Sequence, residues 1–368
     1  MRKFIKYSLF LATLLFAILL LFSRTIPNLN PYEQSFAGIL GLLVPFLAIC
    51  NFGFLLFWLF LKKYVYVLIP LSAIIFSWKI FSVTFAGHVF KQQNFEKDKN
   101  TFTVMSYNVR LLDLYNWSKV TGTREKMIQF FAEQNPTVLC LQEFYNGNDS
   151  IGKNNIKDIK QKCNYKYVAV CNINVNKRGA WGSVIFSHIP IIKKENHDID
   201  LYGNNLLQQV DVLFLKDTIS IFNIHLKSNK FSAEESDMIV KNEHVDLNKK
   251  TSSKTKAIYQ KLEKNAMNRG LEAKLVSQII YTNKKSKIVC GDLNDIPTSY
   301  VYFKMRDNMN DAFLENCFGI GSTFISKFPV LRIDYIFHSK NLETIGFKKI
   351  KIPYSDHYPL LVHFKPKL

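Results

Sequence analysis

The 368-residue sequence lacks the local patterns of several common catalytic and metal sites. Its six cysteines form no CxxC pair, which argues against a zinc site. There is no GxSxG motif, no cysteine in the context of a catalytic nucleophile and no glycine-rich phosphate loop. The glycine pairs at 179/182 and 319/321 fit neither glycine motif. The sequence therefore gives no support for serine-nucleophile, cysteine-nucleophile or P-loop chemistry.

Acidic residues are also scarce. The chain has 29 Asp and Glu against 48 Lys and Arg, a net charge of +19, and residues 101–368 alone carry 26 against 38. A basic domain attracts polyanions such as nucleic acid, anionic lipid headgroups or phosphorylated small molecules. A basic surface that serves only solubility explains the charge equally well.

Charged residues are nearly absent from the first ninety positions. Three apolar segments lie there, at 7–23, at 36–61, and at 64–78 continuing past Lys79 to residue 86. Each approaches or exceeds the roughly 20 residues that a helix needs to cross a bilayer. The stretch SRTIPN after the first segment has no small-residue cleavage site, which argues against a signal peptide. We therefore predict three transmembrane helices.

Basic residues around these segments predict an orientation. Three precede the first segment and two lie between the second and third, whereas the connection between the first and second holds only Arg24. By the positive-inside tendency, the N-terminus faces the cytoplasm and residues after about 87 lie outside it. The expected organisation is a membrane anchor over 1–87, a polar linker over 88–100 and a soluble domain over 101–368. Cys163 and Cys171 could form a disulfide outside the cytoplasm, and the sequence leaves this open.

The soluble domain reads as many short strands with few helices. Helical periodicity covers about 123–134 and 255–282. Nine runs have strand character: 101–110, 137–144, 165–171, 181–188, 207–215, 218–226, 286–293, 332–339 and 358–364. This pattern predicts an α/β or α+β domain with two packed sheets.

Six of these runs end in, are interrupted by or are closely flanked by polar side chains. The residues are Asn108, Arg110, Glu143, His225, Lys227, Asp292, Asn294, Asp295, Asp334, Asp356 and His357. One such residue is most simply a structural hydrogen bond, but this many carboxylates cannot be buried without counter-charge. A divalent cation would supply it. Oxygen ligands without a thiolate indicate Mg²⁺, with Mn²⁺ or Ca²⁺ as alternatives.

The ordered motifs SYNVR, LQE, RGAWGSVIFS, NIHLKS, GDLND, RIDYIF and SDHYPL give the domain a family resemblance. In this order they resemble the endonuclease/exonuclease/phosphatase superfamily of metal-dependent phosphoesterases. The resemblance implies a four-layered α/β/β/α sandwich of two mixed sheets, with the site at one end of the sheets. It leaves the three apolar segments unexplained.

The resemblance also implies roles for individual residues. Glu143 corresponds to the principal metal carboxylate, with Asn108 and Asp356 near it. His357 corresponds to the histidine beside the attacked phosphorus, as general base or transition-state stabiliser. Asp334 would hold this imidazole in place, as a buried carboxylate does in a Ser-His-Asp triad.

Further roles fall on the remaining polar residues. Asp292 and Asn294 correspond to the pair that positions and deprotonates water and holds a phosphate oxygen. His225 corresponds to a second histidine, whose role is open because RGAWGSVIFS offers it no carboxylate. Arg110 and Lys227 are the expected substrate contacts. Because abasic-site enzymes carry a carboxylate at the position of Arg110, abasic-site repair is disfavoured.

The sequence thus predicts a membrane-anchored, metal-dependent phosphoesterase that hydrolyses phosphodiester bonds, with nucleic acid as the leading substrate. The alternatives are a phospholipid or sphingolipid phosphodiesterase and a small-molecule phosphatase. A more remote one is a catalytically silent binding module, which the presence of Glu143, Asp292 and His357 disfavours. The apolar segments hold only Lys79 as a charged residue, so plain anchoring in the bilayer is their expected role.

Overall fold

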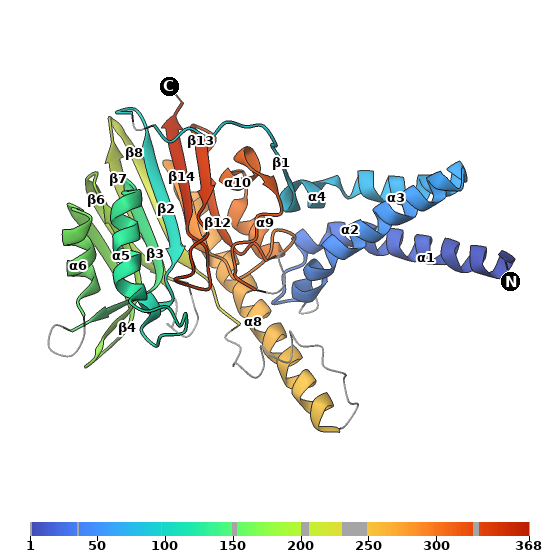
Figure 1. Ribbon diagram of the computed structural model, residues 1–368, viewed down its shortest axis with the longest axis horizontal. Helices are drawn as coiled ribbons and strands as arrows, with labels where there is room; N and C mark the ends of the chain where they lie inside the picture. Colours follow the sequence, from blue (N-terminus) through green and yellow to red (C-terminus); the bar gives the residue numbers. More distant parts are fainter. Residues whose placement is uncertain are drawn as a thin grey trace. The chain divides into compact units, whose positions relative to one another are not determined.

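The computed structural model gives the fold as two compact units (Figure 1). The helical unit comprises Met1–Phe85, His244–Leu271 and Ile296–Lys304, and the sandwich unit comprises Ala86–Glu243, Glu272–Asp295 and Met305–Leu368. The structure describes residues 2–34, 37–96, 98–148, 153–199, 206–229, 249–326 and 331–367.

The helical unit is built from apolar helices joined by a few buried hydrogen bonds. Its elements are α1 (Arg2–Phe22), η1 (Ser23–Asn28), α2 (Ala37–Phe60), α3 (Tyr64–Phe76) and α4 (Trp78–Thr84). The Trp58 indole donates to Thr13 Oγ1 at 2.9 Å, and Asn51 Nδ2 donates to the carbonyl oxygen of Phe16 at 3.0 Å. Residues from later in the chain belong to the same unit, since the Thr298 hydroxyl donates to the carbonyl oxygen of Gly41 at 2.9 Å.

The expectation of three continuous spans needs correction at the third. Two helical segments, Phe4–Asn28 and Gly41–Phe60, are long and apolar enough to cross a membrane. The third segment is broken at Ser77, where α3 and α4 meet with a bend of 61°. There the Ser77 hydroxyl donates to the carbonyl oxygen of Leu20. The described part of the chain therefore has two candidate spans, or three if the bent pair is counted as one.

The sandwich unit contains two six-stranded mixed sheets. One has the order β13-β14-β2-β3-β5-β4 and the other β10-β12-β9-β8-β7-β6, and each contains one parallel pair, β2 with β3 and β8 with β9. The first sheet consists of β2 (Phe102–Asn108), β3 (Val138–Gly147), β4 (Tyr167–Asn176), β5 (Gly179–Ser187), β13 (Leu342–Lys349) and β14 (Leu360–Pro366). The second consists of β6 (Ile191–Asp198), β7 (Leu206–Phe214), β8 (Asp217–His225), β9 (Ser286–Asp292), β10 (Asn310–Asp311) and β12 (Asp334–His338).

Alternation along the strands explains how the sheets pack. In β2, Phe102 and Val104 enter the core between the sheets, whereas Met105 and Tyr107 enter a second core on the other face. Strand β3 alternates in the same way between these two cores, because successive side chains of a strand point to opposite faces. Strands β8 and β9 add Ile221, Ile288 and Cys290 to the core between the sheets. The predicted sandwich of two mixed sheets is confirmed.

Helices cover the outer faces of both sheets. Helices α5 (Thr123–Gln134) and α6 (Asn155–Lys162) bury Met127, Phe131 and Ile159 against the first sheet. Helix α8 (Lys249–Thr282) spans both units. Lys287 of β9 points away from the core between the sheets and donates to the carbonyl oxygen of Ile280, which places this end of α8 on the outer face of the second sheet. Short elements complete the unit: β1 (Ala86–Gly87), η2 (Arg110–Asp113), α10 (Ala312–Asn316) and β11 (Phe318–Gly319). Helix α9 (Tyr300–Arg306) contributes to both units, since the boundary falls after Lys304.

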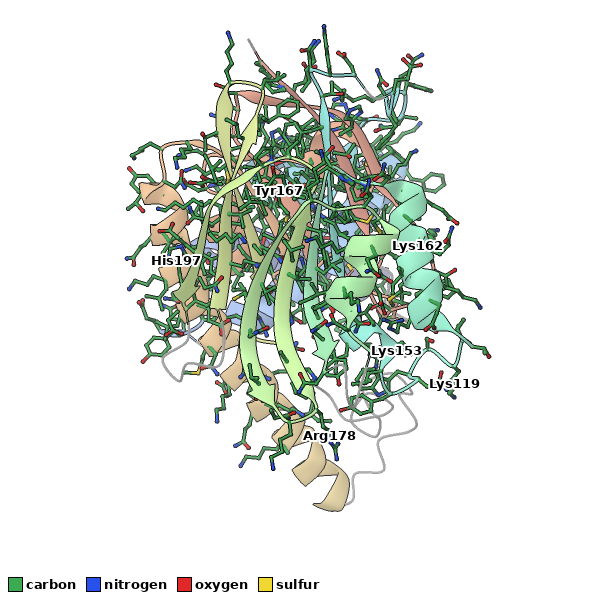
Figure 2. The ribbon with its side chains drawn as sticks, turned by 90° about the vertical axis from the view of Figure 1, so that its left-hand side faces the viewer. Lys119, Lys153, Lys162, Tyr167, Arg178 and His197 are labelled. Carbon is green, nitrogen blue, oxygen red and sulfur yellow. The ribbon has the colours of Figure 1, made fainter. Side chains whose placement is uncertain are left out.

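Different segments form the two edges of the first sheet. Figure 2 shows the edge of the first sheet, where β4 begins at Tyr167 and turns into β5 at Arg178, with α6 ending at Lys162 beside it. At the other edge, the described part of segment 88–100 follows β13: Asn94 N donates to the carbonyl oxygen of Ile345, and Gln93 Oε1 accepts from Phe347 N. The cysteines are all free thiols, including Cys163 and Cys171.

Candidate active site

The polar residues of the site continue the core between the two sheets at one end. Asn108 of β2 and Gln142 of β3 occupy alternate positions whose side chains face the opposite sheet. The same holds for the side chains at the site end of β8, β9 and β12, which are His225, Asp292 and Asp334. Because the side-chain period of a strand is two, each lies on the face that points to the opposite sheet. The carboxyl ends of β8 and β9 lie at the same edge because the two strands are parallel.

Strand register places the acidic residues side by side. Asp292 pairs with His225 on β8 and with Asp334 on β12, and Asn108 pairs with Gln142. Gly291 makes the approach of β8 possible. Its φ is +137°, and a Cβ there would lie 2.0 Å from the carbonyl oxygen of Ile224.

Glu143 reaches the site through a β-bulge in β3. The register with β5 shifts between Leu141 and Phe144, and Glu143 has a φ of +46°. Leu141 and Phe144 both enter the core under α5, so the two residues between them, Gln142 and Glu143, are available to the opposite face. An extra residue in a bulge redirects a side chain in this way.

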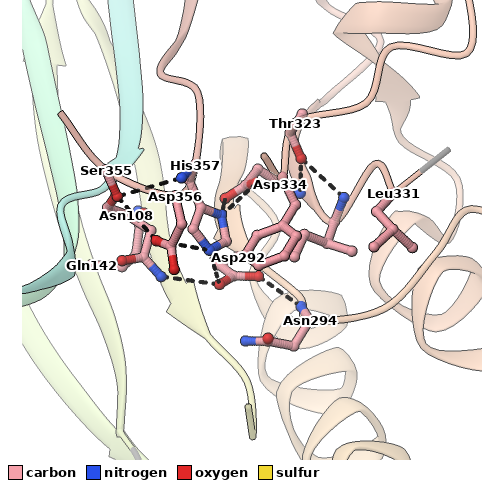
Figure 3. A network of polar contacts seen from close by, with 12 residues as sticks. Asn108, Gln142, Asp292, Asn294, Thr323, Leu331, Asp334, Ser355, Asp356 and His357 are labelled. Carbon is pink, nitrogen blue, oxygen red and sulfur yellow. Dashed lines mark hydrogen bonds and ion pairs between the residues drawn. The ribbon is translucent and has the colours of Figure 1, made fainter. Parts of the chain in front are cut away.

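Asp292 is the centre of the cluster. Its side chain is 1% exposed, and its Oδ2 accepts a hydrogen bond from Asn108 Nδ2 at 3.1 Å. The same oxygen lies 3.6 Å from His357 Nε2 and 3.8 Å from His225 Nε2. Oδ1 accepts from the backbone N–H of Asn294 at 2.8 Å (Figure 3). One carboxylate therefore faces nitrogen atoms from both sheets.

The imidazole of His357 is held between two carboxylates. Nδ1 lies 2.9 Å from Asp334 Oδ2, whereas Nε2 faces Asp292 (Figure 3). Phe324 packs edge-on against the ring with centroids 5.1 Å apart. Burial alone would lower the pKa of His357, but the charges of Asp334 and Asp292 raise this pKa to about 10. The imidazole is therefore a cation at neutral pH.

Asp292 and Glu143 have opposite pKa shifts. Burial raises the pKa of Asp292 to about 6, against the lowering effect of His357. Burial also acts to raise the pKa of Glu143, but the hydrogen bond and charge of His225 outweigh it and bring this pKa to about 2. Asp292 can thus exchange a proton near neutrality, whereas Glu143 stays ionised.

His225 has a carboxylate partner that the RGAWGSVIFS strand could not supply. Its Nε2 lies 3.3 Å from Glu143 Oε1. Burial acts to lower the pKa of His225, but Glu143 raises it above the usual value. The partner comes from the bulge of β3, which the sequence did not reveal.

Arg110 and Asp356 lie next to this cluster. Arg110 Nε is 3.3 Å from Asp356 Oδ2, and Asp356 Oδ1 is 4.0 Å from His357 Nε2. The Arg110 backbone N–H also donates to Asn108 Oδ1 at 3.1 Å. Both side chains are partly exposed, so they can contact a molecule that enters the site.

Three predicted residues make contacts outside the cluster. Asn294 donates its side-chain amide to the carbonyl oxygen of Leu226 at 3.0 Å. The backbone N–H of Lys227 donates to Glu272 Oε2 at 2.8 Å. Asp295 is buried, and its carbonyl oxygen accepts from the Tyr335 hydroxyl. The structure therefore brings Asn108, Glu143, His225, Asp292, Asp334, Asp356 and His357 together, with Arg110 at the edge.

Three further residues support the cluster, and the sequence reading had not singled them out. Ser355 donates to the carbonyl oxygen of Asn108 at 2.8 Å and accepts from the backbone of His357. The Thr323 hydroxyl accepts the backbone N–H of Asp334 at 3.0 Å. Gln142 donates to Asn223 Oδ1 at 2.7 Å. Ser355 and Gln142 stand inside the SDHYPL and LQE motifs, whereas Thr323 has no local signal.

The donor set of the site fits a hard divalent cation. Asp292, Asp334 and His357 can offer ligand atoms within 4.8 Å of one another. However, Asp334 and His357 already bind each other, which leaves them less suited to a cation. Glu143, which stays ionised, and the amide and carboxylate oxygens of Asn108 and Asp356 are the oxygen donors that Mg²⁺ prefers.

Comparison with known families agrees with this geometry. The profile of the Endonuclease/Exonuclease/phosphatase family matches residues 105–357, which include every member of the cluster. The chain belongs to this family. A second profile, described as a domain of unknown function (DUF8431), matches residues 2–84. No curated protein matches the chain.

Solved structures share the fold at low sequence identity. The endonuclease/exonuclease/phosphatase from Beutenbergia cavernae DSM 12333 is 13% identical with a TM-score of 0.52, covering 73% of this chain and 72% of that one. The family protein from Leptotrichia buccalis C-1013-b is 15% identical with a TM-score of 0.51, covering 72% and 99%. The family protein from Bacteroides thetaiotaomicron is 16% identical with a TM-score of 0.51, covering 73% and 98%. The likeness is one of fold.

Proposed function

We propose that this protein is a membrane-anchored, divalent-metal-dependent phosphodiesterase that hydrolyses nucleic acid. The observation that carries the proposal is the arrangement of His357 between Asp334 and Asp292, with Asn108 joining Asp292 from the other sheet. Hydrolysis of a phosphodiester needs an activated water, donors for the phosphoryl oxygens and a route for protons. The cluster has a group suited to each.

Proton transfer falls to Asp292 and His357. The Asp292 carboxylate, with a pKa of about 6, accepts a proton from the attacking water, and Asn294 helps to place that water. His357, protonated at neutral pH, donates a hydrogen bond to a phosphoryl oxygen and stabilises the charge that develops there. Asp334 acts as a positioning residue because it fixes Nδ1 of this imidazole. His225 keeps the Glu143 carboxylate ionised and in place.

Glu143, Asn108 and Asp356 are the residues that would hold the cation, for which Mg²⁺ is the first candidate. When bound, the cation neutralises negative charge on the phosphate and stabilises the leaving oxygen. The burial of Asn108 keeps this amide fixed, so that its oxygen is oriented before substrate arrives.

Basic loops at the same end of the sheets support a polyanionic substrate. The loops that follow β2 and precede α6 carry Lys119 and Lys153, and the β4–β5 turn carries Lys177 and Arg178, all exposed (Figure 2). The backbone of Asn148, just after β3, donates to the carbonyl oxygen of Arg178, so this turn lies beside the end of β3. Phosphate contacts from Lys and Arg give sequence-independent affinity for nucleic acid.

The second candidate is cleavage of a phospholipid or sphingolipid headgroup. It is favoured by the helical unit, where large apolar side chains such as Phe4, Leu11 and Phe46 are exposed along α1 and α2 and would face lipid. From the basic residues that flank the apolar segments we infer that the N-terminus lies in the cytoplasm and the sandwich unit outside it. Protease protection of a C-terminal tag on intact cells, with digestion only after permeabilisation, would contradict this inferred orientation.

The test uses the full chain in detergent micelles, because α8 and α9 contribute to both units. Hydrolysis of plasmid DNA, sphingomyelin vesicles and bis-p-nitrophenyl phosphate is followed with Mg²⁺ and then with EDTA. We expect EDTA-sensitive nicking of DNA. Cleavage of sphingomyelin alone would support the lipid candidate, and inactivity on all three substrates would refute the nucleic-acid proposal.

A further inference from the structure

Two large aromatic side chains stand exposed on the loop that leaves the site. Residues 109–122 connect β2 to α5, and in this loop Tyr115 is 60% and Trp117 is 42% exposed. Their ring centroids are 4.9 Å apart and the rings are tilted by 57°. Aromatic side chains of this size normally gain stability by burial. We call the pair the aromatic platform.

The platform is connected to the catalytic cluster by one side chain. The guanidinium carbon of Arg110 lies 4.7 Å from the centroid of the Trp117 ring. The same guanidinium is paired with Asp356 at 3.3 Å, and Asp356 is next to His357. A series of contacts through Arg110 and Asp356 therefore links Trp117 to the imidazole.

The loop holds the platform in a fixed and strained conformation. Arg110, Leu111, Leu112 and Asp113 all have φ between +44° and +57°, which non-glycine residues adopt at a cost. Leu112 is buried beneath α5 and anchors this turn. Asp113 accepts hydrogen bonds from the backbone and the hydroxyl of Ser118. A turn held this way orients Tyr115 and Trp117 before any substrate binds.

We propose that the aromatic platform stacks the nucleobase next to the scissile phosphate, while Arg110 contacts the phosphate itself. This inference rests on the proposed phosphodiesterase function and adds a base-binding subsite to it. Aromatic rings and Arg planes are surfaces on which bases of single-stranded nucleic acid stack, and each stacked base adds about tenfold or more in affinity. Stacking tolerates any base, so the subsite selects nucleic acid rather than a particular sequence.

The positive charge of Arg110 beside the platform favours one kind of ligand over another. A quaternary ammonium headgroup would bind against the face of an aromatic ring through a cation–π interaction. One side of Trp117 already carries the Arg110 cation, which repels a second cation nearby. A neutral base attached to an anionic phosphate has the complementary charge, because the base meets the rings and the phosphate meets the guanidinium.

The chain offers a matched control for this pair. Tyr281 in α8 is 65% exposed, and Lys284 Nζ lies 4.7 Å from its ring centroid. It lines a cavity of about 430 Å³ beside Ser286, at the opposite end of β9 from Asp292. Tyr281→Ala therefore removes an exposed ring beside a cation without touching the site.

The first experiment compares two substrates of equal charge with the full chain in detergent micelles and Mg²⁺. One is octathymidylate, and the other has the same phosphodiester backbone with a tetrahydrofuran unit in place of every nucleoside. We expect Trp117→Ala and Tyr115→Ala to raise KM for octathymidylate by about tenfold, with kcat within about twofold of wild type. KM for the base-free substrate should not change. Trp117→Phe should keep most of the wild-type affinity, and Tyr281→Ala all of it.

A second measurement detects stacking without turnover. Octathymidylate is added to the Asp292→Asn chain, and tryptophan fluorescence is recorded beside that of the same chain with Trp117→Phe added. The chain has four tryptophans, so quenching that disappears with Trp117→Phe reports contact at this ring. The base-free backbone should produce no quenching.

The outcomes separate the platform from the proposed function. Metal-dependent hydrolysis of both substrates with equal KM, unaffected by Trp117→Ala, would overturn the platform and leave the phosphodiesterase standing. Failure to cleave either substrate would count against the proposed function, and the fluorescence measurement would then decide the platform alone. If Trp117→Ala instead weakened binding to phosphatidylcholine vesicles and left octathymidylate binding intact, the pair would be a membrane contact and the inference would fail.

Discussion

The side-chain amide of Asn108 donates a hydrogen bond to the Asp292 carboxylate, with 3.1 Å between Nδ2 and Oδ2. Asn108 ends β2 in one sheet, and Asp292 ends β9 in the other. The polar cluster of the site is therefore shared between the sheets, and either sheet alone would present only part of it.

Removal of the charge on Asp292 tests its role in proton transfer. Asp292→Asn keeps the size of the side chain and should lower kcat by about 10²- to 10⁴-fold, because the amide cannot accept a proton from water. Steady-state hydrolysis of DNA measures the loss. Asp307→Asn, at an exposed position, serves as the control and should be active. A fully active Asp292→Asn chain would remove this residue from the mechanism.

Asp334→Asn tests the positioning of His357. The imidazole would lose the carboxylate that holds Nδ1, and kcat should fall by about 10²- to 10⁴-fold. Because Asp334 raises the pKa of His357, its loss should move the alkaline limb of the pH–rate profile to lower pH. An unchanged profile beside a reduced kcat would show that Asp334 serves folding rather than the imidazole.

Glu143→Gln tests the cation site. The amide removes a carboxylate that stays ionised down to a pH of about 2, and Mg²⁺ affinity should fall by about 100-fold. Isothermal titration of Mg²⁺ into the full chain measures this directly, without reference to activity. Glu125→Gln, which removes an exposed carboxylate paired with Lys153, should leave Mg²⁺ affinity unchanged.

Gly291→Ala tests the close approach of β8 and β9. The new Cβ would meet the carbonyl oxygen of Ile224 at 2.0 Å in a backbone region that alanine avoids, so the free energy of unfolding should fall by about 3 kcal/mol. Thermal unfolding in detergent provides the measurement. Gly87→Ala is the matched control, because nothing lies within 4 Å of its added Cβ.

Low pH should lower the stability of the sandwich unit through protonation of Asp211. Burial acts to raise the pKa of this carboxyl, but Lys285, at 2.5 Å, and Ser220 lower it below the usual 3.8. A depressed carboxyl pKa stabilises the fold at pH values above the unfolded pKa, and this contribution is lost as pH falls through the folded pKa. Asp211→Asn should therefore cost about 1–3 kcal/mol at pH 7, with the difference from wild type shrinking below about pH 4. A constant difference from pH 3 to 7 would contradict the linkage.

The sequence predicted the interior strands of the sandwich because they alternate clearly between two buried faces. It missed β6 and β13, which are edge strands whose exposed positions carry charged residues, as in KKEN and FKK. Helix α5 lies where its periodicity placed it, whereas α8 begins six residues before the predicted start.

Most site residues could be found because each ends or interrupts an apolar run. Three features could not be found in this way. The bulge that turns Glu143 toward His225 depends on register with β5 rather than on local sequence. The hydroxyl of Thr323 reaches Asp334 across a loop. The left-handed turn at Arg110 occurs without a glycine, so nothing in the composition of that segment announces it.

Cys140 and Cys290 meet in the core between the sheets. Each lies two residues before a polar residue of the site, Gln142 and Asp292 respectively. Because protein cores are close-packed, the size of these two side chains affects the distance between the sheets near the site. A larger aliphatic side chain at Cys140 or Cys290 would push the sheets apart near the site, whereas alanine would let them move closer together. Substitutions in the apolar core would thus change the distance between the polar residues of the two sheets without altering any polar side chain of the site.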